Sequence, residues 1–228
     1  MAEESWGMSD EYERLLDATG EARMAYFRTL GVPDADVWAP LVTPAFMGGP
    51  AWPTRPAWQR IRVGERTTIA SSGLSDPFSD EDGPNVGFGV EMAVASTEPL
   101  PTDLRPSWLL DLAQAVSDQA AADGRFQLRH AKFGLFLFGV RMAASDFWRP
   151  FADAKGYCGL LLGQSVPRLD PTIRLPTGEA VLLTAKLLTR SEYEFAASAG
   201  PEGAQRLGEL FAQDGSHHLS SLQRASVI

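Results

Sequence analysis

Two carboxylates in one stretch of the chain, Asp76 and Glu91, are the candidate site residues. Asp76 lies in a Ser-Asp-Pro turn sequence. Glu91 lies in segment 86–95, where it is the one charge on a face of glycines and alanines. Carboxylates that meet across a loop can do general acid–base chemistry, and exposed carboxylates can contact a partner. Each residue could instead be structural. Asp76 could form the turn, and Glu91 could pair with another side chain of the fold.

Other catalytic motifs are incomplete. The segment Gly163-Gln-Ser-Val-Pro167 lacks the second glycine of a nucleophile elbow. The segment Gly87-Phe-Gly-Val-Glu-Met92 lacks the third glycine of a dinucleotide-binding loop. Cys158 lies in an apolar run with no neighbouring histidine, so we expect a small buried hydrophobe rather than a reactive thiol. The sequence therefore predicts neither a catalytic residue nor a cofactor.

The histidines and the acidic loop do not predict a metal centre. His217 and His218 are adjacent, so in an extended segment their side chains point apart and chelate poorly. We expect these two and His130 at the surface. If Gly83 is the sixth position of a calcium loop, Phe78 and Gly89 occupy the positions that need carboxylates. A weak cation site at Ser79–Gly83 is left open.

Composition excludes some function classes. The chain has 228 residues with 44% hydrophobic residues, which is typical of a globular protein. Its net charge of −9 and pI of about 4.8 disfavour nucleic acid as a partner. The acidity serves solubility, or else it steers a basic partner. No secretory signal or membrane-length apolar run is present, so we expect a cytoplasmic protein without a membrane partner.

The positions of apolar and turn-forming residues predict alternating helices and strands. The N-terminal helix is expected over 9–30, with Gly20 as a possible break, and an irregular wrap packed by its own aromatics over 33–56. Segment 132–140 is apolar on both faces and is expected inside a sheet. The other elements are two hairpins (58–63 with 66–71, and 172–175 with 180–188), strands over 86–95 and 159–162, and helices over 107–122, 189–198 and from 201.

These elements predict an α+β fold, a mixed β-sheet sandwich flanked by helices. We expect one domain over residues 1–228, made of an N-terminal helical segment over 1–30 and a sheet-containing core over 31–228.

The order of two short motifs resembles the suppressor of fused domain family, in its short single-domain bacterial form. The first is Ser71-Ser-Gly-Leu-Ser-Asp-Pro77, followed by a strand with Val90-Glu-Met92. The second is Leu187-Leu-Thr-Arg-Ser-Glu-Tyr-Glu-Phe195. A helix opened by Pro106-Ser-Trp108 lies between them. The likeness covers roughly residues 30 to 228.

This resemblance implies a protein-binding role without catalysis. Animal members grip an extended peptide with the help of a second domain, for which we expect no room here, so that grip is not carried over. Short bacterial members are thought to include immunity proteins that neutralise toxins by blocking them, and a basic toxin domain would suit the acidic chain. Asp76 and Glu91 transfer as candidate partner-binding residues. The alternatives are an enzyme with a carboxylate site at these two residues, and a self-associating scaffold; the oligomeric state is open.

Overall fold

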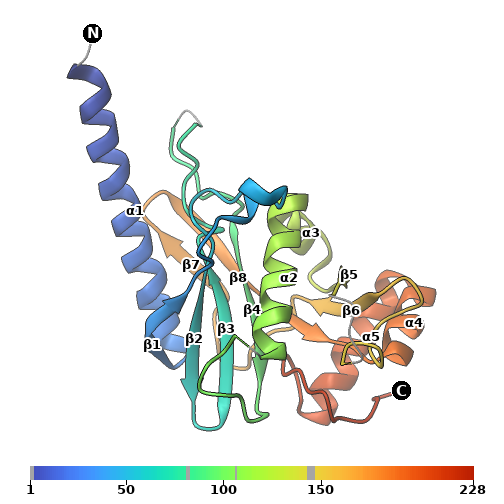
Figure 1. Ribbon diagram of the computed structural model, residues 1–228. Coiled ribbons are helices and arrows are strands. Elements are labelled where there is room, and N and C mark those ends of the chain that lie inside the picture. The colour runs from blue at the N-terminus through green and yellow to red at the C-terminus, as the bar shows by residue number, and fades with distance from the viewer. Residues whose placement is uncertain (1–2, 81–82, 106, 143–146) are drawn as a thin grey trace.

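The computed structural model describes residues 3–80, 83–105, 107–142 and 147–228, with side chains from Asp10 onward. Glu81 and Asp82 of the acidic loop, and Pro106 before the second helix, lie outside the described residues. The helices are α1 (Glu3–Leu30), α2 (Trp108–Asp123), α3 (Phe126–Phe133), α4 (Arg190–Ala199) and α5 (Pro201–Asp214), with a short 3₁₀ helix η1 (Pro44–Met47) (Figure 1). The strands are β1 (Val32–Trp38), β2 (Ala57–Val63), β3 (Arg66–Ser72), β4 (Val90–Ser96), β5 (Phe136–Arg141), β6 (Tyr157–Leu162), β7 (Thr172–Leu175) and β8 (Gly178–Leu187).

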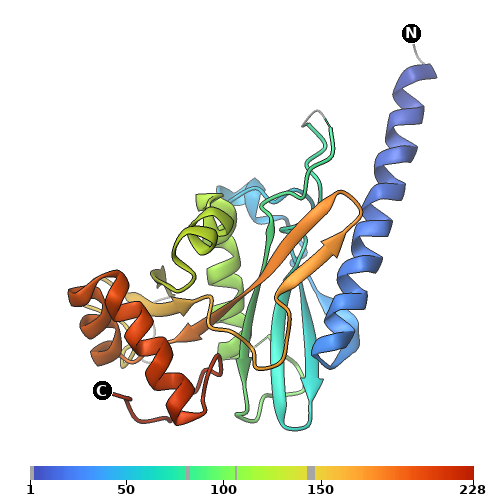
Figure 2. The ribbon, with the colours of Figure 1, turned by 180° about the vertical axis from the view of Figure 1, so that it is seen from behind.

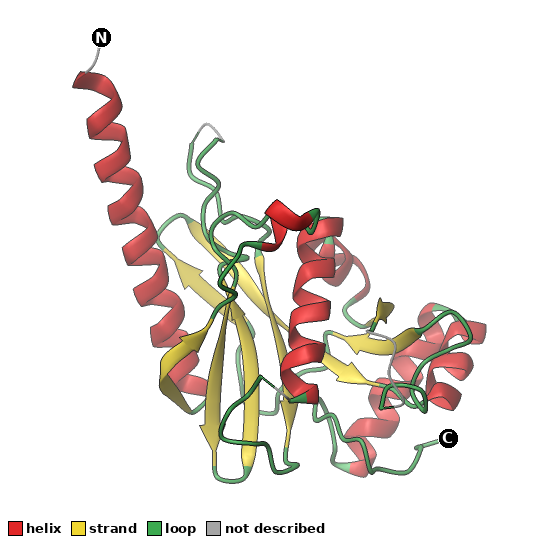
Figure 3. Ribbon diagram, in the orientation of Figure 1, coloured by secondary structure: helices red, strands yellow, loops and turns green. Residues whose placement is uncertain are grey.

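The described strands form one mixed sheet in the order β1-β2-β3-β4-β8-β6-β5, with β7 paired to β8 beside this path (Figure 3). The central pair, β4 and β8, is parallel, and the other pairs are antiparallel. The predicted α+β class with a mixed sheet is confirmed. Helices, rather than a second sheet, cover its faces.

The alternation of side chains along the strands divides the core into layers on the two faces of the sheet. On one face, Ile69 and Val94 pack with α2 through Leu109. On the other face, Ala70 and Ala93 pack with Phe27 of α1. Further along this second face, α4 and α5 cover β6 and β8, where the cluster comprises Leu161, Leu188, Ala196, Ala204, Leu207 and Phe211. Figures 1 and 2 show α2 on one side of the sheet and α1 with α5 on the other.

The helix α1 is longer than predicted and unbroken at Gly20. Its C-terminal half packs on β7, β2 and β1, and its N-terminal half projects beyond the sheet (Figures 1 and 2). None of the helices in the described part of the chain is long and apolar enough to cross a membrane.

The substitution Gly20→Ala should stabilise the protein by up to about 1 kcal/mol. A β-carbon at this position would meet nothing within 4 Å, and alanine loses less backbone entropy than glycine in a helix. Thermal unfolding midpoints test this, with Gly203→Ala as the contrast. Gly203→Ala should lower the midpoint, because a β-carbon at Gly203 would lie 2.5 Å from the carbonyl oxygen of Ala196. A lower midpoint for Gly20→Ala would contradict the expectation.

Region 33–56 is only partly the irregular wrap that the sequence predicts. Its first residues form β1, which pairs with β2 through an irregularity between Pro33 and Val37. An edge strand tolerates proline because one side of its backbone needs no partner. The expected aromatic packing is present, since Trp58 lies 5.4 Å from Trp38 and 5.3 Å from Trp52 between ring centroids. Phe46 departs from it, because it is 86% exposed.

The predicted strand over 86–95 begins later, at Val90. Gly87 and Gly89 have φ of 54° and 67°, and the amide of Gly89 donates to the carbonyl of Val86 at 2.8 Å. Because of this turn, Val86 does not follow the in–out alternation of the strand. Val86 packs on the sheet face covered by α1, whereas Val90 packs on the face covered by α2.

Segment 132–140 is not a strand inside the sheet. Residues up to Phe133 belong to α3, and β5 begins at Phe136 and forms the edge of the sheet beyond β6. It is apolar on both faces because helices cover both: Phe126 of α3 packs against Phe136 and Phe138, and Leu137 packs with the α4–α5 cluster. The apolar residues on both faces of segment 132–140 thus indicate that both faces are covered, but they do not indicate a central position in the sheet.

Local signals in the other segments are confirmed. The β2–β3 and β7–β8 hairpins form as predicted. Ser107 caps α2 by accepting from the amide of Leu110 at 3.2 Å. Thr189 and Glu192 form the capping box of α4.

Candidate functional site

Asp76 and Glu91 are brought together in the fold, but around a third residue that the sequence analysis missed. Arg23 of α1 donates from Nη1 to Asp76 Oδ1 at 2.6 Å, and the same nitrogen lies 3.4 Å from Glu91 Oε1. All three side chains are buried, with exposed fractions of 6% for Arg23, 7% for Asp76 and 0% for Glu91. The signal for Arg23 was available, since it shares one helix face with Phe27 and Leu30, and a buried arginine needs an acid.

Glu91 is held by the turn that follows β3. Its Oε1 accepts from the amides of Gly73 and Ser75, both at 3.1 Å, and from Ser75 Oγ at 2.6 Å. Its Oε2 accepts from Ser71 Oγ. Burial raises the pKa of Glu91, and Arg23 with these donors opposes the rise. The Gly-Leu-Ser-Asp turn is thus tied to the middle of the sheet.

Asp76 is also bound by groups of this chain. Besides Arg23, it accepts from Thr54 Oγ1 through Oδ2. The oxygens of both carboxylates therefore bind groups of this chain, which removes the observation on which the enzyme alternative depended. A partner would reach either carboxylate only if the turn opened, so their role as partner-binding residues stays a prediction.

The histidines do not form a metal centre. Among the described residues, no group of three or more His, Cys, Asp or Glu side chains could hold an ion. The surface expectation is wrong for His218, which is 5% exposed and has no hydrogen-bond partner at Nδ1. Cys158 is buried as predicted, and burial raises the pKa of its thiol to about 12.

His218 should make the protein sensitive to acid. Burial, then Arg66, Lys186 and His217, lower the pKa of His218 to about 4, below its ordinary value of 6.5. As the pH falls below 6.5 the unfolded chain binds a proton that the folded chain excludes, so stability is lost between pH 6.5 and 4, by up to about 3 kcal/mol. Urea unfolding at several pH values should show a flatter dependence for His218→Leu than for the wild type; parallel curves would contradict this assignment.

Four large apolar side chains between β1 and β2 face solvent. This 41–47 apolar segment comprises Leu41, Val42, Phe46 and Met47, which are 98%, 54%, 86% and 81% exposed. Hydrogen bonds hold parts of its backbone: Phe46 donates its amide to Thr43 O at 3.0 Å, and Arg55 donates to Pro40 O just before the segment. Several large exposed apolar side chains within one short segment are typical of an interaction surface.

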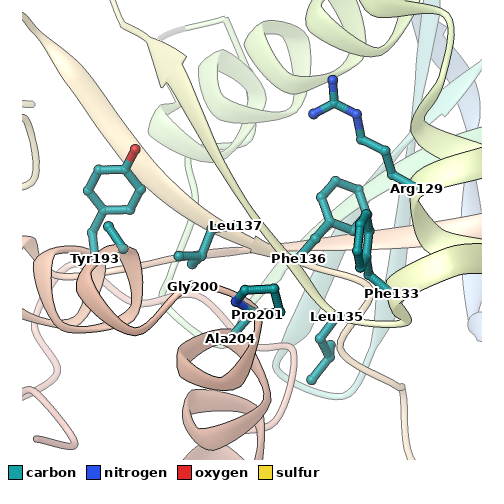
Figure 4. Close-up of a pocket in the computed structure, with 10 residues that line it drawn as sticks. Arg129, Phe133, Leu135, Phe136, Leu137, Tyr193, Gly200, Pro201 and Ala204 are labelled. Atoms are coloured by element: carbon teal, nitrogen blue, oxygen red, sulfur yellow. The ribbon is translucent and has the colours of Figure 1, made fainter.

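A groove lies at the other end of the sheet. One of its sides is formed by α3 and the start of β5, and the other side by α4 and α5. Its volume is about 400 Å³. Apolar side chains form most of its wall, and Arg129 and Tyr193 stand at opposite sides of it (Figure 4). Size and lining fall within the range of binding sites in proteins.

Charge is divided unevenly along the chain. Residues 1–124 contain 20 Asp or Glu against 8 Lys or Arg, a net charge of −12, whereas residues 125–155 contain two against six, a net charge of +4. The acidic part includes α1 and the 41–47 apolar segment, and the basic part includes α3 and the edge strand β5. The net charge alone conceals this uneven distribution of charge along the chain.

The chain resembles known structures. No protein-family model and no curated protein matches the sequence. A chain in the crystal structure of the Sufu-Fu complex matches with a TM-score of 0.58 at 20% identity, over 93% of this chain and 92% of that one. This protein has a Suppressor of Fused-like fold. The fold expectation from the motifs around Asp76 and Glu192 is thus confirmed.

The crystal structure of Drosophila Suppressor of Fused matches with a TM-score of 0.57 at 17% identity, over 93% of this chain. The Suppressor of Fused-like chain spans about half (51%) of the Drosophila chain. At these identities the likeness establishes the fold, and the expectation of one domain over residues 1–228 stays a prediction.

Proposed function

We propose that this protein is a binding domain that recognises another protein and changes no covalent bond. The observation that carries the proposal is the 41–47 apolar segment, where Leu41 and Phe46 are 98% and 86% exposed on or beside a hydrogen-bonded turn. Burying such side chains against a partner contributes about 25 cal/mol per Å² of apolar surface. One structural neighbour comes from the crystal structure of the Sufu-Fu complex, which agrees with such a role for this fold.

The charge of the surrounding chain indicates the partner's chemistry. The first 124 residues, which include the 41–47 apolar segment, carry a net charge of −12. A basic protein would be attracted to this part of the chain by long-range electrostatics. A bacterial immunity protein that blocks a basic toxin domain, in the cytoplasm, fits this chemistry. A large toxin gene beside this one would support that setting.

Affinity capture from the native cell tests the proposal. The bait is the wild-type protein, and the matched control is Leu41→Ser with Phe46→Ser, which changes surface residues only and should leave the unfolding midpoint unchanged. We expect a basic protein on the wild type, weakened by salt and lost from the double variant. Recovery of no protein at low or high salt, or the same proteins on both baits, would contradict the proposal.

Self-association is the second candidate, because the same exposed segment could meet another copy. A native mass at the monomer value, independent of concentration, would exclude it. The enzyme alternative at Asp76 and Glu91 has no such support, since both carboxylates bind groups of the fold.

A further inference from the structure

The groove between α3 and α5 is formed by closely packed walls. Leu135 packs against Gly208 of α5, where a β-carbon would lie 2.4 Å from Leu135 Cδ1. Gln205 of α5 donates from Nε2 to the carbonyl of Phe133 at 3.1 Å, joining α5 to the end of α3. The two sides of the groove are therefore fixed in relation to each other before anything binds.

A large apolar side chain of its lining is not fully covered by the chain. Phe133 of α3, which lines the groove, is 41% exposed. Leu137 on the floor and Ala197 on the α4 side continue the apolar lining. One large apolar side chain from a partner would replace water along this lining.

The charged side chains on the α3 side of the groove are cationic. Helix α3 contains Arg129, His130 and Lys132 and no acidic residue. Arg129 is anchored by one nitrogen to Asp123 Oδ2 at 2.6 Å, with its side chain still 36% exposed. Lys132 Nζ lies 5.0 Å from the Phe133 ring centroid, so its charge is beside the groove. A matching ligand needs negative charge next to its apolar part.

The Tyr193 hydroxyl provides a further polar group. It makes no hydrogen bond to the described residues around it, and Figure 4 shows it on the opposite side of the groove from Arg129. Polar groups on both sides of an apolar floor suit an extended stretch of peptide better than a compact ligand.

We propose that this groove is a second docking site, which binds an acidic segment of a partner protein. One apolar side chain of the segment lies on Leu137 and Ala197, and its carboxylates face Arg129 and Lys132. The inference rests on the proposed function in that the occupant is a protein. It assigns a different surface, the groove rather than the 41–47 apolar segment, and an occupant of opposite charge, acidic rather than basic.

A random dodecapeptide library displayed on phage, selected against the whole protein, tests this without knowledge of the partner. The groove is filled by Ala197→Trp, an exposed position on its wall. The matched control is Ala212→Trp, an exposed position on α5 outside the groove lining. Unfolding midpoints establish that both variants are folded.

We expect enriched peptides with several Asp or Glu around one large apolar residue. Their affinity, measured by fluorescence anisotropy, should fall about tenfold or more with Ala197→Trp and remain unchanged with Ala212→Trp. Lys132→Glu should weaken binding, most at low salt. No enrichment, enriched peptides of basic composition, or binding that survives Ala197→Trp would overturn the proposal.

Two further outcomes would assign the groove to another occupant and so overturn the proposal. One is sedimentation of the protein with phosphatidylglycerol vesicles, lost on Lys132→Glu, without peptide enrichment. The other is a concentration-dependent dimer that Ala197→Trp abolishes. Neither outcome bears on the capture experiment with Leu41→Ser and Phe46→Ser, so the failure of this inference is distinguishable from failure of the proposed function.

Discussion

Replacing Arg23 with methionine is expected to destabilise the protein by about 3–5 kcal/mol, because two buried carboxylates lose the cation that they share. Asp76 and Glu91 are 7% and 0% exposed, and Arg23 is 2.6 Å from the first and 3.4 Å from the second. Methionine retains much of the volume, so the loss reports charge rather than a cavity. Urea unfolding at pH 7 measures it.

Two comparisons make this result specific to the buried pair. The matched control is Arg28→Met on the exposed face of the same helix, which should change stability by less than about 0.5 kcal/mol. Adding Glu91→Gln to Arg23→Met should recover part of the loss, because an uncharged amide leaves fewer unpaired buried charges. If Arg23→Met and Arg28→Met unfold at the same urea concentration, the network does not stabilise the fold as described.

Replacing Arg224 with methionine is expected to cost about 3 kcal/mol, because it uncouples the C-terminal segment from α4. Both Nη atoms of Arg224 donate at 2.5 Å to the carboxylate of Glu192, which is fully buried. Burial acts to raise the pKa of Glu192, but Arg224 and the amides of Val227 and Thr189 outweigh it and hold that pKa below its usual value.

Hydrogen exchange separates this effect from a general loss of stability. Amides of residues 219–228 should exchange faster in Arg224→Met under native conditions, while those of β2 and β3 remain protected. The control is Arg206→Met, whose partner Glu209 is 60% exposed and whose loss should cost less than about 0.5 kcal/mol. Unchanged exchange over 219–228 would count against the role of Arg224.

The parts of the fold that the sequence predicted are those with local physical causes. The capping box at Thr189, the cap at Ser107 and the hairpin at Gly64 each depend on residues within a few positions of one another. Pairing between distant segments has no such signal. The edge position of β5 and the existence of β1 depend on which strands find partners, and segment 132–140 looked central only because helices cover both of its faces.

The candidate site shows the same division. Asp76 and Glu91 both contact Arg23, but Arg23 lies 53 residues before Asp76, and its role follows from tertiary packing of α1. The sequence predicts a wrap over 33–56 packed by its own aromatics, because apolar residues among prolines do not reveal whether they face inward. Exposure of Phe46 is a property of the folded chain alone.

Native mass spectrometry of the complex captured on the wild-type protein tests whether this protein acts by binding alone. We expect a complex whose mass equals the summed masses of unmodified chains, and loss of that complex with Leu41→Ser and Phe46→Ser together. A partner released with an altered mass, or a complex indifferent to those two substitutions, would contradict the claim that this protein acts by binding through an exposed apolar surface.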